Sequence, residues 1–496
     1  MIEHISLGLD MVLQWQSLLA ILFGVTWGIF GGMIPGINST IAMALILPFT
    51  WGMDPVVAMM MLAGVYAGGE YGGSIPAILI GTPGTNAAAC TVLDGYELHK
   101  QGRTGLALYT SLISSSFGGL IGAAVLILVA VPLAGVALAF GPAEYFSLAT
   151  VGLTLVCSLG EKNVLKGILA GMLGVLLSTV GFDPFSAVPR FTFGILSLNE
   201  GFKMIPLMMG LFAVSEMFKQ SQRLTSDSDF VLSTKTDTSF PSWKEIKNFL
   251  PFSSLAALAG VVIGAMPGAG ATAAAFITYS EAKRWSKNSD SFGQGNPIGV
   301  AVPEAANNAV TGGAMVPLLA LGIPGSNSTA IMLGALMIHN VTPGPLLFTK
   351  SPEIPYGIFV ALFIANICMF IAGYFFIKFA IKATSISKSA LIAVVITLVF
   401  TGSYAYSGEI FDIGVALCFG LLGILMRHFK VPHTATVLGF VLGFIMEANL
   451  RRALIVSDGS YSGVIFNSGI SSVLFIIAVA SVVVSLIRGF RTQVAK

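Results

Sequence analysis

Charged residues are scarce in this chain: Asp, Glu, Lys and Arg make up 10% of its 496 residues, well under the roughly 25% of soluble proteins. Hydrophobic residues make up 55%. Apolar runs of about 20 residues, the length that crosses a bilayer as a helix, recur from residue 17 to residue 487. This pattern excludes an ordinary soluble domain. It predicts an all-α polytopic integral membrane protein with about 12 transmembrane segments.

Other absences narrow the function. No Lys or Arg precedes Lys100, so the positive region of a signal peptide is missing and we expect the first apolar segment to be retained. No basic patch with interleaved aromatics occurs, which argues against nucleic acid as a partner. The histidines are not placed to face one another, so we expect no metal site. Single cysteines without CxxC spacing predict neither disulfides nor zinc binding: Cys90, Cys157, Cys368 and Cys418.

The chain repeats itself on either side of a hydrophilic stretch at residues 219–248. The segment "GIFGGMIPGINSTIA" (28–42) returns as "GVVIGAMPGAGATAA" (260–274), with the same spacing of Gly, Pro-Gly, Thr and Ala. The segment "GGSIPAILIGTPGTN" (72–86) returns as "GAMVPLLALGIPGSN" (313–327). Two ungapped matches in the same order indicate an internal duplication. We expect a first repeat at residues 1–220, a cytoplasmic linker at 221–250, and a second repeat plus a C-terminal transmembrane helix at 251–496.

Basic residues predict that the two repeats are inverted, because Lys and Arg collect in cytoplasmic loops. The loop after "GTPGTN" contains Lys100 and Arg103, and the loop after "MPGAGAT" contains Lys283, Arg284 and Lys287. In each case the equivalent loop of the other half contains no basic residue. Equivalent loops are therefore expected on opposite sides of the membrane, and the C-terminus in the cytoplasm.

The same parity predicts a helical hairpin at residues 251–279, which must start and end in the cytoplasm. We expect two short helices that turn near Pro267 and Gly268, and a twin around Pro35 and Gly36 that enters from outside. Inverted repeats with interrupted helices are the architecture of many secondary transporters, in which the interruptions meet near the bilayer midplane.

The breaks carry neutral polar side chains that suit a ligand. A half-helix that starts inside the membrane presents unpaired N–H groups and a positive dipole end, which suit a carboxylate. Unwound carbonyls and hydroxyls suit Na⁺. The alternative is that the Pro-Gly pairs only kink helices and the polar residues satisfy freed backbone groups. The candidate substrate-binding residues are Asn38, Ser39, Thr40, Gly84, Thr85, Asn86, Gly268, Thr272, Gly325, Ser326, Asn327 and Ser328.

The two Pro-Gly-Thr/Ser-Asn breaks differ in one respect. Ser328 and Thr329 stand where the first copy has Ala87 and Ala88. If the site is asymmetric, the second-half break should therefore supply more of the polar contacts.

Glu304 is the main candidate for ion coupling, because a carboxylate inside a membrane is costly and is a functional candidate by default. Asn307 and Asn308 follow it on the same helical face. Together they could bind a cation, relay a proton or hydrogen-bond the substrate. The alternative is a helix-end glutamate wetted from the cytoplasm. Three other acids are weaker candidates, for which a structural role near a loop competes with a functional one: Glu70, Glu216 and Glu447.

The motifs resemble those of the large membrane subunit of the tripartite tricarboxylate transporters, the TctA type. The similarity rests on "GMIPGIN", "YGGSIPAILIGTPGT", "GFDP" with "PRFTFG", "MPGAGA", "PEAANNA" and "GIPGSNSTA", in this order along nearly the whole chain. It implies a secondary carrier of the bacterial inner membrane that imports citrate-like or other organic carboxylates on a Na⁺ or H⁺ gradient. It also implies a small membrane subunit of the TctB type and a periplasmic solute-binding protein of the TctC type as partners. By analogy with other carriers that have paired hairpins, the motion is expected to be of the elevator type.

Two other classes of function compete with a carrier. An ion or solute channel would share the polar breaks. An intramembrane enzyme would need a nucleophile with a base, or a metal cluster, and the sequence has no GxSxG and no His or Lys paired with a Ser.

Overall fold

The computed structural model describes residues 2–34, 37–159, 164–222, 237, 239–268, 270–380 and 388–494. It is helical almost throughout, and its two short strands, β1 (Gly181–Phe182) and β2 (Pro189–Arg190), form one antiparallel hairpin. Five described helices are long and apolar enough to cross a membrane. The expected all-α polytopic membrane fold is therefore confirmed, whereas the figure of about 12 spans stays a prediction.

The chain divides into two compact units, and each takes segments from both halves of the sequence. The first unit comprises residues 1–132 and 216–398, and the second comprises residues 133–215 and 399–496. All four break regions belong to the first unit.

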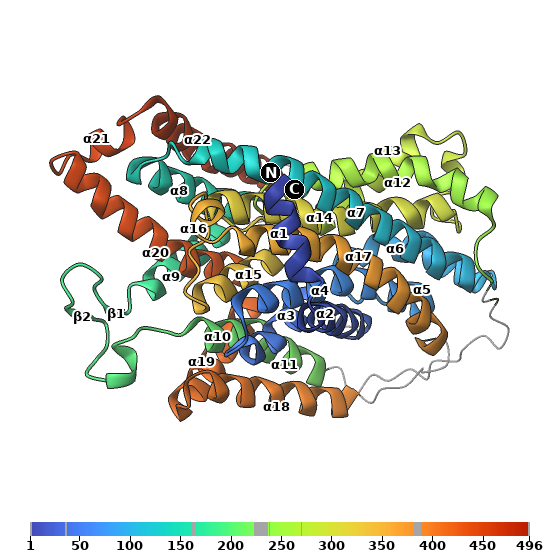
Figure 1. The fold of residues 1–496 in the computed structure, drawn as a ribbon, viewed down its shortest axis with the longest axis horizontal. Helices are drawn as coiled ribbons and strands as arrows, with labels where there is room; N and C mark the ends of the chain where they lie inside the picture. Colours follow the sequence, from blue (N-terminus) through green and yellow to red (C-terminus); the bar gives the residue numbers. More distant parts are fainter. Residues whose placement is uncertain are drawn as a thin grey trace. The chain divides into compact units, whose positions relative to one another are not determined.

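The elements of the first unit are α-helices, which are labelled in Figure 1, and short 3₁₀ turns. From the first half they are α1 (Ile2–Val12), α2 (Trp15–Met33), α3 (Ser39–Ile46), η1 (Leu47–Thr50), α4 (Pro55–Gly72), α5 (Ser74–Ile80) and α6 (Ala88–Lys100). From the second half they are α12 (Trp243–Gly264), α13 (Gly270–Trp285), η4 (Ser289–Ser291), α14 (Pro297–Leu321), α15 (Asn327–Ile338), α16 (Leu347–Lys350) and α17 (Glu353–Ala380).

The second unit contains the hairpin and a further set of helices. They are α8 (Pro142–Leu159), α9 (Val164–Ser178), η2 (Leu196–Leu198), α10 (Met204–Met208), the π-helical turn η3 (Met209–Val214), α19 (Ile410–His428), α20 (His433–Val456), α21 (Tyr461–Ile465) and α22 (Gly469–Val494). Three helices run through the unit boundaries: α7 (Thr104–Ala137), α11 (Ser215–Ser221) and α18 (Lys388–Ser407).

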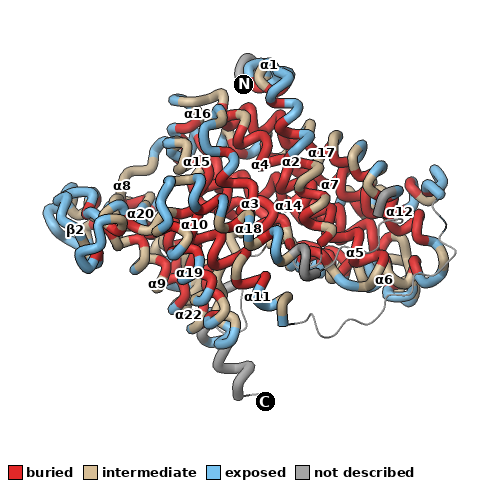
Figure 2. The backbone as a smooth tube through the Cα atoms, turned by 90° about the horizontal axis from the view of Figure 1, so that it is seen from below, coloured by how far each residue is buried: buried red, intermediate tan, exposed pale blue. Residues whose placement is uncertain are grey.

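The core of the first unit is built around α4 and α14, which are buried on nearly every side (Figure 2). Both helices begin in the same way. The Asp54 side chain accepts the N–H of Val56 before Pro55 opens α4, and the Asn296 side chain accepts the N–H of Ile298 at the start of α14. A Pro in the first turn has no N–H to leave unpaired, so it fits there. The two halves thus fix the start of their central helices with the same local chemistry.

Glycines let equivalent helices approach closely in both halves. α2 packs on α4, and α12 packs on α14. A Cβ added at Gly28 would meet the backbone carbonyl of Val65, and one added at Gly260 would meet the carbonyl of Ala306. Each of these carbonyls lies at the same place in its repeat. The duplicated sequence therefore packs alike in the two halves, through the close backbone contact that small residues allow.

The break expected near Pro267 and Gly268 lies where the sequence placed it. α12 ends at Gly264, Gly268 has φ +87°, and α13 begins at Gly270 and contacts α12. The first arm is longer than expected, because Ser242 and Glu245 form a capping box that starts α12 before residue 251. The twin turn at Pro35 and Gly36 lies outside the described residues.

Candidate functional site

The broken helices of the two halves meet in crossed pairs within the first unit. α3 follows the first-half "PGIN" break and contacts α15, which follows the second-half "GIPGSN" break. Reciprocally, α13 after "PGAG" contacts α6 after "GTPGTN". The chain therefore has two related interfaces between breaks, which the sequence predicts only as a single grouping.

The α3–α15 interface is lined with hydroxyl groups. Ser328 Oγ lies 3.2 Å from Ser39 Oγ and 3.2 Å from Thr40 Oγ1, and all three side chains are buried. The α6–α13 interface has small apolar residues in the same setting: Ala87, Cys90, Ala274 and Ala275 form one buried cluster there. Farther along the same two helices, Tyr279 donates to Asp94 over 2.8 Å. The predicted excess of polar ligand contacts at the second-half break stays a prediction.

Glu70 extends this hydroxyl-lined interface inward from α4. Ser39 Oγ donates to Glu70 Oε1 over 2.5 Å, and Asn307 Nδ2 donates to the backbone carbonyl of Glu70 over 3.2 Å. Glu70 is 7% exposed and lies within α4, so the interpretation of Glu70 as an acid near a loop is wrong. We call Ser39, Thr40, Glu70, Asn307 and Ser328 the Glu70 cluster.

The start of α15 is held beside this cluster by its own cap. Ser326 Oγ accepts the N–H of Thr329 over 3.2 Å, and Thr329 Oγ1 accepts the N–H of Ser326 over 2.8 Å. Tyr66 on α4 contributes a hydroxyl that lies 2.9 Å from Ser326 Oγ. These bonds use the capping hydroxyls of α15. The remaining N–H groups of its first turn are the ones that can bind an anion.

Glu304 sits in a separate hydroxyl cage. Ser115 Oγ donates to Glu304 Oε2 over 2.9 Å, Ser111 Oγ donates to the same oxygen over 3.3 Å, and Thr91 Oγ1 donates to Oε1. These donors come from α6 and α7, and Glu304 is 1% exposed. A helix-end glutamate wetted from the cytoplasm is therefore the wrong interpretation. We call Thr91, Ser111, Ser115 and Glu304 the Glu304 cluster.

The structure separates the other predicted coupling residues from Glu304. Asn307 turns to Glu70, as described above. Asn308 is fully buried, and neither its Oδ1 nor its Nδ2 has a hydrogen-bond partner among the described residues. Asn307 Oδ1 is likewise buried without a partner. Such orphan atoms are costly in a dry interior, and they mark the interior face of α14 as the place where a ligand or water would be bound.

The remaining predicted residues fall into three groups. Gly84 and Gly325 permit close packing, because a Cβ there would meet the carbonyl of Gly32 or of Gly264, equivalent positions in the two halves. Two residues cap helices: Asn38 accepts the N–H of Ile41, and Thr85 accepts the N–H of Ala88. The third group lies away from the Glu70 cluster contacts, with Asn86 and Thr272 exposed and Gly268 and Asn327 half-buried.

Sequence reasoning missed the donors around Glu304 and misjudged Glu70. The Ser111 and Ser115 pair was readable as an i, i+4 stripe of hydroxyls on one helix face, in the segment "SLISSS". Nothing in the sequence alone joins that stripe to Glu304.

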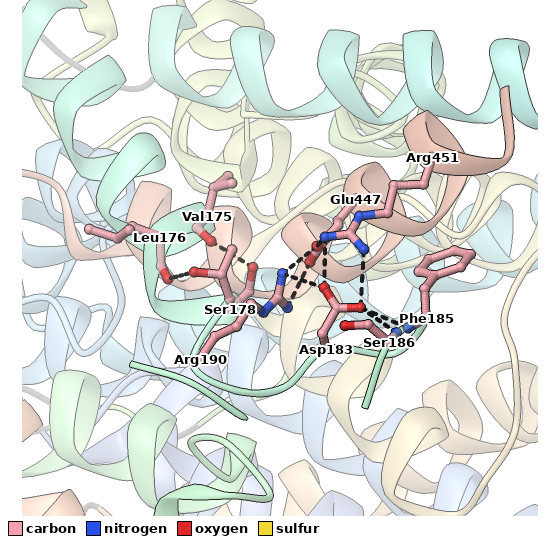
Figure 3. Close-up of polar contacts among 10 residues, drawn as sticks. Val175, Leu176, Ser178, Asp183, Phe185, Ser186, Arg190, Glu447 and Arg451 are labelled. Carbon is pink, nitrogen blue, oxygen red and sulfur yellow. Dashed lines mark hydrogen bonds and ion pairs between the residues drawn. The ribbon is translucent and has the colours of Figure 1, made fainter. Parts of the chain in front are cut away.

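A charged cluster in the second unit ties the β1–β2 hairpin to α20 (Figure 3). Arg190 pairs with Glu447 over 2.6 Å and with Asp183 over 3.2 Å, and Arg451 pairs with Asp183 over 2.7 Å. The backbone N–H of Ser186 and the Arg451 guanidinium hold the pKa of Asp183 well below its ordinary value. Glu447, one of the weaker candidate acids, thus has the Arg190 guanidinium as its ion-pair partner.

Comparison with known proteins gives consistent results along the chain. The family model of the tripartite tricarboxylate transporter TctA family matches residues 18–438. A protein of Agrobacterium vitis, described as an uncharacterized 52.8 kDa protein in the TAR-I ttuC' 3' region, is 35% identical over 99% of this chain and 98% of its own length. A second protein of that organism, from the TAR-II ttuC' 3' region, is 33% identical over 47% of this chain and 96% of its own length. No solved structure matches the chain.

Proposed function

The chain belongs to the tripartite tricarboxylate transporter TctA family, and from this membership we propose the finer role of a carrier subunit that imports organic carboxylates. It would work in the bacterial inner membrane on a Na⁺ or H⁺ gradient, with its C-terminus in the cytoplasm. A small membrane subunit and a periplasmic solute-binding protein would complete the system. The class of a membrane-embedded tricarboxylate transporter subunit follows from the family itself.

The observation that best supports this role is the meeting of α3 and α15 at the Glu70 cluster. Both helices start at breaks, so both present N–H groups and positive dipole ends to the same region. Hydroxyls of Ser39, Thr40 and Ser328 lie there as neutral donors. A carboxylate is recognised by this combination of backbone N–H and hydroxyl donors.

Substrate contacts are proposed at the breaks of both halves, with the α3–α15 interface as the centre. Gly84 and Gly325 keep the backbone of the two breaks close to the C-terminal ends of α2 and α12. The exposed Asn86 and Thr272 would act at the mouths of the breaks. The hydroxyls and unwound carbonyls of the breaks also suit Na⁺.

Glu304 is proposed as an ion-coupling group, and Asn307 and Asn308 are proposed to contribute separately, with Asn307 at the Glu70 cluster. The buried carboxyl group of Glu304 has only hydroxyl partners in the described structure, so a change of its charge would be felt strongly in a low-dielectric interior. Because all four break regions belong to the first compact unit, an elevator motion would carry this unit with its ligands.

Uptake of radiolabelled citrate by proteoliposomes, with the two partner subunits supplied, tests the proposal. A hydroxyl that bonds a charged ligand contributes about 1.5–3 kcal/mol, so Ser328→Ala should weaken uptake at least about tenfold. Ser280→Ala is the matched control, because Ser280 is exposed on α13 and bonds only the carbonyl of Phe276.

Two results would count against the proposed role. Equal uptake by the Ser328 and Ser280 variants would remove the α3–α15 interface from the substrate path. Flux that does not saturate and proceeds at channel rates would replace the carrier with a channel.

A further inference from the structure

Glu70 is a buried acid without a cationic partner. Its carboxyl group accepts a hydrogen bond from Ser39, and its backbone carbonyl accepts one from the Asn307 side chain. No ion pair within the part of the chain that the structure describes includes Glu70. An uncompensated buried carboxylate costs several kcal/mol. Some positive charge is therefore required whenever this group is ionised.

The Glu70 cluster also has more acceptors than donors. Its three hydroxyl groups and the Asn307 amide supply five protons, whereas its acceptors are the backbone carbonyl and two carboxyl oxygens of Glu70, the three hydroxyl oxygens and the amide oxygen of Asn307. That amide oxygen is buried and has no hydrogen-bond partner, and Asn307 is 1% exposed. A single proton on Glu70 would satisfy one acceptor. A cation is coordinated by several oxygens at once.

We propose that the Glu70 cluster is a Na⁺ site, with ligands drawn from the Glu70 carboxylate, the hydroxyls of Ser39, Thr40 and Ser328, and Asn307 Oδ1. All of these groups are oxygens, which bind hard cations rather than soft metals. The cluster contains one carboxylate, so a monovalent ion neutralises it, whereas a divalent ion would leave a net positive charge in a buried place.

The Glu304 cluster is the poorer sodium site of the two. Both oxygens of Glu304 already accept hydroxyl protons, three in all. Fewer lone pairs remain for a metal ion, and the donors would have to turn away before it could bind. This difference separates the roles of two acids that both lie on the interior of the first unit.

The proposal rests on the carrier function above, and it gives a physical reason why Na⁺ binding and carboxylate binding would be coupled. Ionised Glu70 would repel a substrate carboxylate at the neighbouring start of α15. A bound Na⁺ removes that repulsion and so raises the affinity for the carboxylate, and the substrate raises the affinity for Na⁺ by the same factor. Sodium binding should therefore be detectable without substrate and should strengthen when substrate is added.

Titration of the purified full-length chain in detergent with NaCl, at ionic strength held constant by choline chloride, tests the site directly. The readout is the thermal unfolding temperature, which rises with a ligand that binds only the folded state. We expect a saturable rise for the unmodified chain. Glu70→Gln should abolish this rise, and Ser328→Ala should weaken the apparent affinity about tenfold. Glu97→Gln is the matched control, because Glu97 is exposed and pairs with Lys100.

The proposal is overturned if the unmodified chain shows no sodium-dependent rise, or if Glu70→Gln titrates like the Glu97 variant. If Glu70→Gln does not fold, the same titration is made with Ser39→Ala and Ser328→Ala. An unchanged sodium affinity in both variants also overturns the proposal. The outcome is distinguishable from that of the carrier assay. Sodium binding without citrate uptake refutes the carrier and leaves the site, whereas uptake without sodium binding refutes the site.

Discussion

The cost of removing Ser115 should reveal the charge carried by Glu304. Ser115 Oγ donates to Glu304 Oε2 over 2.9 Å, while Ser111 reaches the same oxygen only over 3.3 Å. A hydrogen bond to a charged group contributes about 1.5–3 kcal/mol, and one between neutral groups about 0.5–1.5 kcal/mol. Ser115→Ala removes one oxygen atom and leaves almost no cavity. We therefore expect a loss of about 2 kcal/mol in unfolding free energy if Glu304 is ionised, and about 1 kcal/mol if it is protonated.

The neighbouring Ser116 supplies the control. It is also buried on α7, but its hydroxyl has no hydrogen-bond partner in the part of the chain that the structure describes. Ser116→Ala should therefore change the unfolding free energy by less than about 0.5 kcal/mol or raise it slightly. Unfolding of the purified chain in detergent, followed by the loss of helical circular dichroism, measures both variants. The same pair in a Glu304→Gln background completes a double-mutant cycle.

The cycle has a clear refuting result. If Glu304 is ionised, the cost of Ser115→Ala should fall by about 1 kcal/mol in the Glu304→Gln background, because a neutral amide replaces the charge. Equal costs for the Ser115 and Ser116 variants would show that the bond to Glu304 does not exist. A cost for Ser115→Ala that is unchanged by Glu304→Gln would show that the carboxyl group is not charged in the folded chain.

Two further predictions concern packing and pH. Gly260→Ala should destabilise the chain by about 1–3 kcal/mol, because the new Cβ meets the backbone carbonyl of Ala306 and the two helices must separate. The control Gly414→Ala, at a position on α19 with nothing within 4 Å, should be neutral or stabilising by up to about 1 kcal/mol. Equal effects in the same denaturation assay would contradict the close approach of α12 and α14. The second prediction is that the β1–β2 hairpin loosens only in acid. The pKa of Asp183 is lowered by a backbone N–H and by a guanidinium, so the contribution of its charge is full above the ordinary Asp value of about 3.9 and is lost as the pH falls through the lower folded value. The mobility of a spin label on Val188, measured by electron paramagnetic resonance, should be constant from about pH 8 to pH 5 and rise below about pH 4. Asp183→Asn should give the mobile spectrum at every pH, and loosening of the unmodified hairpin near pH 6 would contradict the assignment.

The breaks and the all-α fold were predictable because their causes are local. A Pro-Gly pair follows the end of α12 and the end of α14, so both ends could be read from the sequence around Pro267 and Pro324, whereas single prolines such as Pro303 lie inside a helix. The grouping of breaks from both halves was predictable from the duplication. Which break meets which was not, because that depends on how the helices cross.

Glu70 shows why the site itself was less predictable. It lies in "AGGEYGGS", and so many glycines favour a loop when the sequence is taken alone. In the structure these glycines are inside α4, and Gly68 and Gly72 bring its backbone against α2. Small residues permit such contacts between membrane helices. The surroundings of Glu70 therefore depend on packing partners that are far away in sequence.

The duplication explains why one polar site can exist where the repeat supplies two equivalent interfaces. The α6–α13 interface packs alanines and Cys90, and its buried polar contact, in which Tyr279 donates to Asp94, is satisfied within the chain. The α3–α15 interface has hydroxyls, an acid and the orphan amide oxygen of Asn307, which are fully satisfied only with something bound. Binding can therefore change the energy of one interface while leaving its twin unaffected. In a chain with two identical polar interfaces, the ligand would stabilise both equally, and binding would not favour one interface over the other. We infer that the replacement of Ser328 by Ala87 in the twin is what confines the response to ligand to one of the two interfaces.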